Sequence, residues 1–204
     1  FFTIAFLASS IGAISGLGGG IIIKPLLDGM GHFDSLQINF LSGCTVLAMA
    51  TVSLIKSKCD GNLFLGRNDL TLAVSGCIGG ILGKLLLDFI THTLLGNDSV
   101  LLLQSYTLIL INAGMIIYLK IKAKIVPINL SNKAACSITG VFLGGISSFL
   151  GIGGGAMNIV VLCAFFSMTT KQAAESSLFI IFCAQLFSLL TSVVTQTIPP
   201  FSTE

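Results

Sequence analysis

Two runs of three consecutive glycines, at residues 18–20 and 153–155, are separated by 135 positions in this chain. Glycine has no Cβ, so a ligand can approach the backbone N–H groups of such a run closely. A serine lies a few residues before each run, Ser15 in the first copy and Ser147 in the second. Amide and hydroxyl donors of this kind, together with the positive end of a following helix, suit a small anion.

The composition indicates a membrane protein as the setting for these runs. Of the 204 residues only 9% are charged and 54% are hydrophobic, whereas a soluble domain carries about 25% charged residues. The mean hydropathy is +1.01. The chain carries too little charge to stay solvated as a disordered protein. A net charge of only +2 gives no basic surface for binding nucleic acid. We therefore expect the lipid bilayer, and not a nucleic acid, as the surroundings of this chain.

Six hydrophobic segments have lengths suited to transmembrane helices, which need about 20 mainly apolar residues. The fifth is too long for one simple span. The first and the fifth are both rich in glycine toward their C-terminal ends. We expect an all-α polytopic membrane protein built from related multi-helix repeats with glycine-rich broken helices. The segments are 1–23, 36–55, 70–90, 100–119, 134–162 and 176–198.

Three successive glycines at membrane depth favour a helix break, because each costs about 1 kcal/mol relative to alanine within a helix. Unwound backbone in a bilayer is tolerated only where it is buried in protein or lines a cavity. The alternative is close helix packing through small residues. Packing alone is the interpretation for the third segment, whose overlapping glycine pairs are Gly76, Gly79, Gly80 and Gly83.

An internal repeat is the second organising feature. Each glycine run ends an apolar segment and is followed by a polar turn and another segment. We predict a first transmembrane repeat of about four helices over residues 1–125 and a partial second repeat of about two segments over 126–204, with further spans expected beyond it. At the offset of 135, Gln37 corresponds to Gln172 and Ser42 to Ser177.

Positive charge predicts the orientation, since short loops rich in Lys and Arg stay in the cytoplasm. The loops after the second and fourth segments are basic, whereas the loop at His92 has no Lys or Arg. This pattern predicts a cytoplasmic N-terminus for a multi-pass protein. We expect the plasma or inner membrane as its location. The basic residues are Lys56, Lys58, Arg67, Lys120, Lys122, Lys124 and Lys133.

The glycine motifs resemble a known family. Residues 16–27 read Gly-Leu-Gly-Gly-Gly-Ile-Ile-Ile-Lys-Pro-Leu-Leu, and residues 149–155 read Phe-Leu-Gly-Ile-Gly-Gly-Gly. Both are similar to the signature of the TauE/SafE family of sulfite exporter-like permeases, and residues 76–84 resemble its third span. Lys24 stands where an apolar residue is usual in that pattern. The resemblance implies about eight spans in two halves and transport of sulfite or a related sulfur oxyanion or organosulfonate.

We therefore predict a secondary transporter that works by alternating access around the two glycine runs. The inferred partner is a small inorganic or organic sulfur anion. We expect no enzyme activity, cofactor or metal. The sequence does not decide whether the protein forms a homo-oligomer. The candidate substrate-binding residues are Ser15, Gly18, Gly19, Gly20, Ser147, Gly153, Gly154, Gly155 and Asn158, and the candidate path or coupling residues are Lys24, Gln37, Ser42, Gln172, Glu175 and Ser177.

Other readings of the polar residues remain open at this point. An intramembrane enzyme would need an acid–base pair converging on Ser15, and a scaffold would tolerate alanine at both runs. Lys84 and Asp88 are four residues apart on one helical face, so they can pair; they are either interfacial charges or functional ones. The six cysteines have no paired spacing, and we interpret them as small apolar residues.

Overall fold

The computed structural model describes residues 20, 24, 25, 29, 35–59, 67–121 and 132–195. The site predictions at Ser15, Gly18 and Gly19 lie outside these residues. The described part is almost entirely helical and contains no strand, which confirms the all-α class. Its elements are α3 (Ser35–Cys59), α4 (Arg67–Phe89), the π-helix η1 (Ile90–Leu95), α5 (Gly96–Ile121), α6 (Lys133–Leu150), α7 (Gly155–Phe166) and α8 (Thr170–Val194).

Five helices of the described part are long and apolar enough to cross a membrane, namely α3, α4 with part of η1, α5, α6 and α8. Their outer faces carry large apolar side chains, such as Leu110, which is 75% exposed. Lipid tails can cover such faces, whereas water cannot do so without a large cost. The expectation of a multi-pass integral membrane protein is therefore confirmed.

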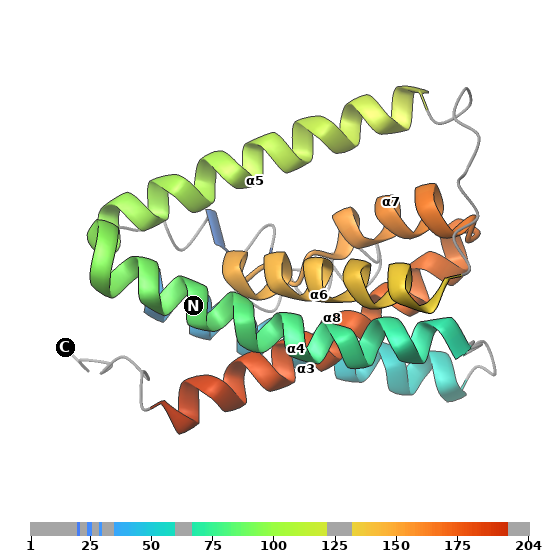
Figure 1. Cartoon of the computed structure of the whole chain (residues 1–204), viewed down its shortest axis with the longest axis horizontal. Helices are drawn as coiled ribbons and strands as arrows, with labels where there is room; N and C mark the ends of the chain where they lie inside the picture. The colour runs from blue at the N-terminus through green and yellow to red at the C-terminus, as the bar shows by residue number, and fades with distance from the viewer. Residues whose placement is uncertain are drawn as a thin grey trace.

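Helix α4 packs closely against α6 and α8, as Figure 1 shows for their middle sections. The contacts are made by glycines, since a Cβ on Gly79 would overlap the backbone of Val141 and Gly145, and one on Gly80 would overlap Ala184. Small residues let helix backbones approach in this way. The packing role predicted for the glycines of the third segment is confirmed.

The connection between the third and fourth segments differs from the predicted loop. The helical backbone continues from α4 through η1 into α5, and the chain reverses direction there (Figure 1). The sequence has no proline or glycine between Leu87 and Leu95 to end the helix. The hydroxyl of Thr91 also bonds the carbonyl of Leu87 at 2.8 Å, so the turn is made by a widened helix instead of a loop.

The fifth segment forms two helices, as its length suggested. Helix α6 ends at Leu150, Gly151 caps it with a φ of 65°, and α7 begins at Gly155. Gly153 and Gly154 also have positive φ, at 77° and 62°. Glycine adopts this left-handed conformation without the steric cost that a Cβ brings. The predicted break at the second glycine run is therefore present.

Helix α8 begins six residues before the predicted sixth segment. Thr169 and Gln172 form a capping box, in which the Thr169 amide donates to Gln172 Oε1 at 3.1 Å, and such a box satisfies otherwise unpaired donors at a helix start. Helices α3 and α8 both have 25 residues and begin at positions 35 and 170. This spacing equals the offset of the glycine runs, while the repeat and its domain boundaries stay predictions.

Candidate functional site

The break between α6 and α7 is buried, and hydroxyls of α3 and α8 hold its two ends. Ser42 Oγ donates to the carbonyl of Gly151 at 2.6 Å, and Ser177 Oγ donates to the carbonyl of Gly155 at 3.3 Å. Both serines are fully buried. Carbonyls freed by an unwound helix need such partners, because water is scarce at membrane depth. Ser42 and Ser177, the matched pair of the proposed repeat, thus fix the backbone of the break.

The break also requires glycine for reasons of space. A Cβ on Gly153 would lie 2.5 Å from Val46 Cγ1 and 3.2 Å from Ile181 Cγ2. Val46 and Ile181 belong to α3 and α8, so these two helices pack directly onto the unwound backbone. Both the left-handed φ and the packing therefore exclude a side chain here.

Two buried polar side chains converge on this backbone at Gly154. A Cβ on Gly154 would lie 3.0 Å from Asn158 Oδ1 and 3.2 Å from Ser147 Oγ. Ser147 is 0% exposed and Asn158 is 1% exposed, yet Ser147 Oγ and both polar atoms of the Asn158 side chain lack a hydrogen-bond partner within the described part of the chain. An unsatisfied buried polar group costs about 1–3 kcal/mol. Three such atoms beside one glycine need a hydrogen-bonding partner, such as a polar ligand or water.

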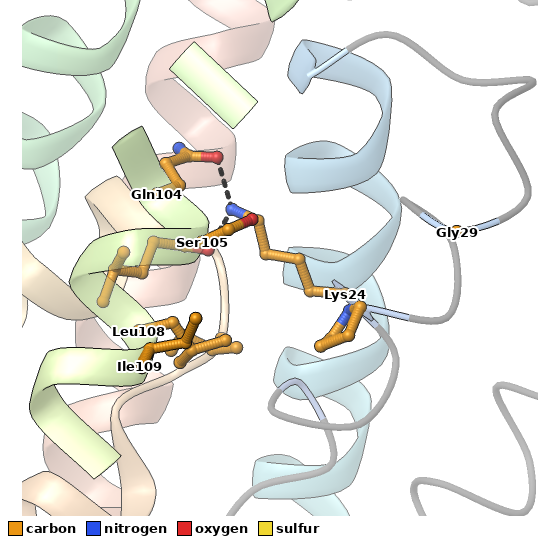
Figure 2. Close-up of a pocket in the computed structure, with 9 residues that line it drawn as sticks. Lys24, Gly29, Gln104, Ser105, Leu108 and Ile109 are labelled. Carbon is orange, nitrogen blue, oxygen red and sulfur yellow. Dashed lines mark hydrogen bonds between the residues drawn. The ribbon is translucent and has the colours of Figure 1, made fainter. Parts of the chain in front are cut away.

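Lys24 lies at the other end of the break, where α6 stops. Its ammonium donates to Asn39 Oδ1 at 2.8 Å, to Gln104 Oε1 at 2.6 Å and to the carbonyl of Leu150. Figure 2 shows the side chain extending toward Gln104 on α5. A cation at a helix C-terminus is favourable, because the exposed carbonyls carry negative partial charge. Lysine has three N–H donors, and these three acceptors are neutral oxygens.

A cavity of about 370 Å³ opens beside this lysine. Its walls are the α5 residues Gln104, Ser105, Leu108 and Ile109 (Figure 2), together with Leu150 and Ile152 at the break. Its size lies within the range of about 300–1,000 Å³ for small-molecule pockets. The cavity is mostly apolar with polar groups at one end, so Lys24 and Gln104 form its polar wall.

The last glycine of the first run touches the second break directly. A Cβ on Gly20 would lie 2.5 Å from the carbonyl oxygen of Ile152 and 2.6 Å from its Cα. Gly20 is buried. Residues 132 positions apart in sequence therefore meet backbone to backbone at this point.

A sequence model of one family, described as Sulfite exporter TauE/SafE, matches residues 1–201. The chain belongs to the TauE/SafE family. No curated protein and no solved structure matches significantly. Membership of the TauE/SafE family, together with the five span-length helices, identifies a multi-pass membrane transporter.

Most of the site residues predicted from the glycine runs and the internal repeat lie around this break. Gly20, Lys24, Ser42, Ser147, Asn158 and Ser177 come together with the second glycine run. Three of the candidate path residues lie elsewhere: Gln172 is an exposed capping residue, Glu175 is partly exposed in the second turn of α8, and Gln37 is partly buried in the first turn of α3.

Sequence reasoning missed two amides that complete the polar environment of Lys24. Asn39 accepts from the ammonium, and Gln104 accepts from it while its Nε2 donates to the carbonyl of Phe149 at 2.7 Å. Gln104 is 1% exposed. An amide within an otherwise apolar span was the available signal, since such a group is costly in lipid unless it has partners.

Proposed function

We propose that this member of the TauE/SafE family carries a small oxyanion across the membrane, with sulfite or a related sulfur oxyanion or organosulfonate as the substrate. The observation that supports this proposal is the buried, unpartnered side chains of Ser147 and Asn158 beside Gly154. In this proposal the chain is a transporter and has no catalytic residue.

The donors near Gly154 match the chemistry of an oxyanion. The backbone N–H of Asn158 donates to the carbonyl of Gly154 at 2.8 Å. The backbone N–H groups of Gly155, Ala156 and Met157 therefore precede the first hydrogen bond of α7. The first amides of a helix lack partners in the helix itself, and they carry about half a positive charge. These backbone N–H groups, the Ser147 hydroxyl and the side-chain NH2 group of Asn158 would surround an oxyanion with hydrogen-bond donors.

The same geometry supports selectivity for a small, compact anion. The glycine run leaves room beside Gly154, and any Cβ there would approach both polar side chains. The 370 Å³ cavity at Ile152 would provide the approach from one side, with the Lys24 charge attracting anions toward it. Ser15, Gly18 and Gly19 of the first run lie outside the described residues and stay candidates for binding the same anion.

Transport would follow from rocking of the two repeats about the contact between Gly20 and Ile152. Transporters with repeated halves bind substrate at the repeat interface and expose it to each side in turn. Ser42 and Ser177, which hold the two ends of the break, would keep the site intact during this motion. Gln37, Gln172 and Glu175 stay candidates for the entrance of the path.

Uptake into proteoliposomes tests the proposal. The full chain is reconstituted and offered labelled sulfite, thiosulfate and a short alkylsulfonate in separate experiments. We expect uptake of at least one of them, and a loss of roughly 10-fold or more in Ser147→Ala and Asn158→Leu, since a hydrogen bond to a charged group contributes about 1.5–3 kcal/mol. Thr51→Val is the control, because the Thr51 hydroxyl donates to the carbonyl of Leu47 in its own helix, α3, at 2.7 Å.

Well-folded wild-type protein that takes up none of the three anions would refute the substrate assignment. Uptake that the control loses as fully as Ser147→Ala would show a general effect of removing a polar side chain, and it would refute the site.

A further inference from the structure

A buried ion pair on α4 lies outside the candidate substrate site. Lys84 Nζ and Asp88 Oδ1 are 2.6 Å apart, and the two side chains are 8% and 12% exposed. Their neighbours Leu85, Leu86 and Phe89 are exposed on the outer face of the same helix. The pair therefore points into the protein, and not toward lipid or the interface as snorkelling charges would. Charges buried within a membrane span are expensive, so they are functional candidates by default.

Lys84 of this pair borders a small polar crevice between α3, α4, α6 and α8. Lys84 lines it together with hydroxyls and amides of the three other helices, and its volume of about 10 Å³ is close to the minimum that holds one water molecule. Two of its hydroxyls are joined, since Ser148 Oγ donates to Ser188 Oγ at 2.6 Å. The polar residues facing Lys84 here are Asn39, Ser148, Gln185, Ser188 and Ser192.

Asn39 connects this crevice to the site at the break. Its Oδ1 accepts from Lys24, while its Nδ2 has no hydrogen-bond partner among the residues that the structure describes, and the residue is 8% exposed. An unpartnered buried N–H group beside a water-sized space is a place for a water molecule. The crevice thus combines the Lys84 ammonium, hydroxyls and one unsatisfied donor.

The last turn of α6 separates the crevice from the proposed oxyanion. Ser147 points to Gly154, and the next residue, Ser148, points to Ser188 in the crevice. Consecutive residues project about 100° apart on an α-helix. A charge on either side of this turn will influence the other strongly, because the interior has a low dielectric constant.

From this juxtaposition we propose that Asp88 binds the proton that couples transport of the oxyanion to a proton gradient. The inference rests on the proposed function of the Ser147 and Asn158 site. A hydronium ion transfers its proton to the Asp88 carboxylate, whose side chain is 12% exposed, leaving water and a neutral carboxylic acid, and only O–H bonds are broken or made. The Lys84 ammonium then lacks its counter-charge, and the oxyanion beyond the α6 turn supplies it.

Release follows the same steps in reverse. When Asp88 loses its proton to water, the carboxylate pairs with Lys84 again and the oxyanion loses that attraction. By linkage, a proton on Asp88 favours anion binding by the same factor by which the anion favours the proton.

Within the part of the chain that the structure describes, few charged groups other than the pair face this region. On α3, α6 and α8 the crevice residues of the described chain are neutral, and Lys24 is the charge beyond Asn39. On η1, His92 lies one turn after Asp88 and is exposed. The coupling therefore depends on Asp88, Lys84 and the oxyanion, and a variant of the pair tests it directly.

The experiment measures transport with and without an imposed pH gradient in proteoliposomes of the full chain. The probes are labelled thiosulfate and a labelled alkylsulfonate, which stay ionised across the pH range, so protonation of the probe cannot imitate coupling. We expect an acidic outside to accelerate wild-type uptake by roughly 5-fold or more, the lower end of ordinary coupling between sites. Asp88→Asn combined with Lys84→Gln, which leaves no unpaired buried charge, should exchange labelled for unlabelled anion yet ignore the gradient.

Asp69→Asn is the matched control, because Asp69 is a buried carboxylate on the same helix that accepts from Ser176 at 2.9 Å. This variant should keep the response to the gradient. A double variant that still responds to the gradient, or wild-type protein that exchanges anions without any response, overturns the coupling role alone. Absence of anion exchange in folded wild-type protein overturns the proposed function and the coupling together.

Discussion

The ammonium of Lys24 donates a hydrogen bond to the carbonyl of Leu150, the last residue of α6. This bond joins residues 126 positions apart and places a positive charge at the end of a broken helix. Asn39 and Gln104 accept from the same ammonium, so α3, α5 and α6 meet at one buried lysine. The break between α6 and α7 is held at its α6 end by this contact.

Replacing this lysine should destabilise the protein. Lys24→Met would leave three oxygens without their donor, those of Asn39, Gln104 and Leu150, and each orphaned buried acceptor costs about 1–3 kcal/mol. Unfolding of the purified protein in detergent should show a loss of about 3 kcal/mol or more. Lys133→Met, at the exposed start of α6, should leave the unfolding free energy within about 0.5 kcal/mol of wild type. Equal stability of the two variants would contradict the role assigned to Lys24.

The close contact of α4 and α6 leads to a second prediction. A Cβ on Gly144 would overlap the backbone of Gly76, whereas a Cβ on Gly114 in α5 would meet none of the described residues within 4 Å. Gly144→Ala should therefore lower the free energy of unfolding by about 1–3 kcal/mol through overpacking. Gly114→Ala should leave stability unchanged or raise it by up to about 1 kcal/mol, because alanine favours the helix more than glycine does. The same unfolding assay checks both, and a stable Gly144→Ala variant would show that the two helices can separate at little cost.

Local properties of the chain were enough to predict some of these features. The helix break follows from three glycines in an apolar segment, and the close helix contacts follow from the glycine spacing around Gly79. The partners of Lys24 could not be predicted, because Asn39 and Gln104 meet it only through the tertiary fold. Gln172 was predicted as a path residue from its match to Gln37, yet it caps α8 with Thr169. A matched position in a repeat therefore does not establish a shared role.

The break itself gives the last prediction, which separates backbone conformation from the presence of a side chain. Gly153 has a φ of 77°, and a Cβ added to it would lie 2.5 Å from Val46 Cγ1. Among the described residues, a Cβ added to Gly145 would come within 4 Å only of the carbonyl oxygen of Gly79, at 3.6 Å. Gly153→Ala should place about 1–2 kcal/mol of backbone strain in the break, in addition to the overlap. We expect anion uptake to fall roughly 10-fold or more, because a shift of about 1 Å in a site can cost about 100-fold in rate.

Gly145→Ala should keep uptake within about 2-fold of wild type, since ordinary van der Waals contact leaves helix packing unchanged. Both variants are reconstituted at equal protein content, and correct insertion is checked by protease protection of the loops. Normal uptake by an inserted Gly153→Ala variant would mean that the left-handed backbone of the break is not required for transport. The glycine run would then serve helix packing, and the anion would bind elsewhere in the protein.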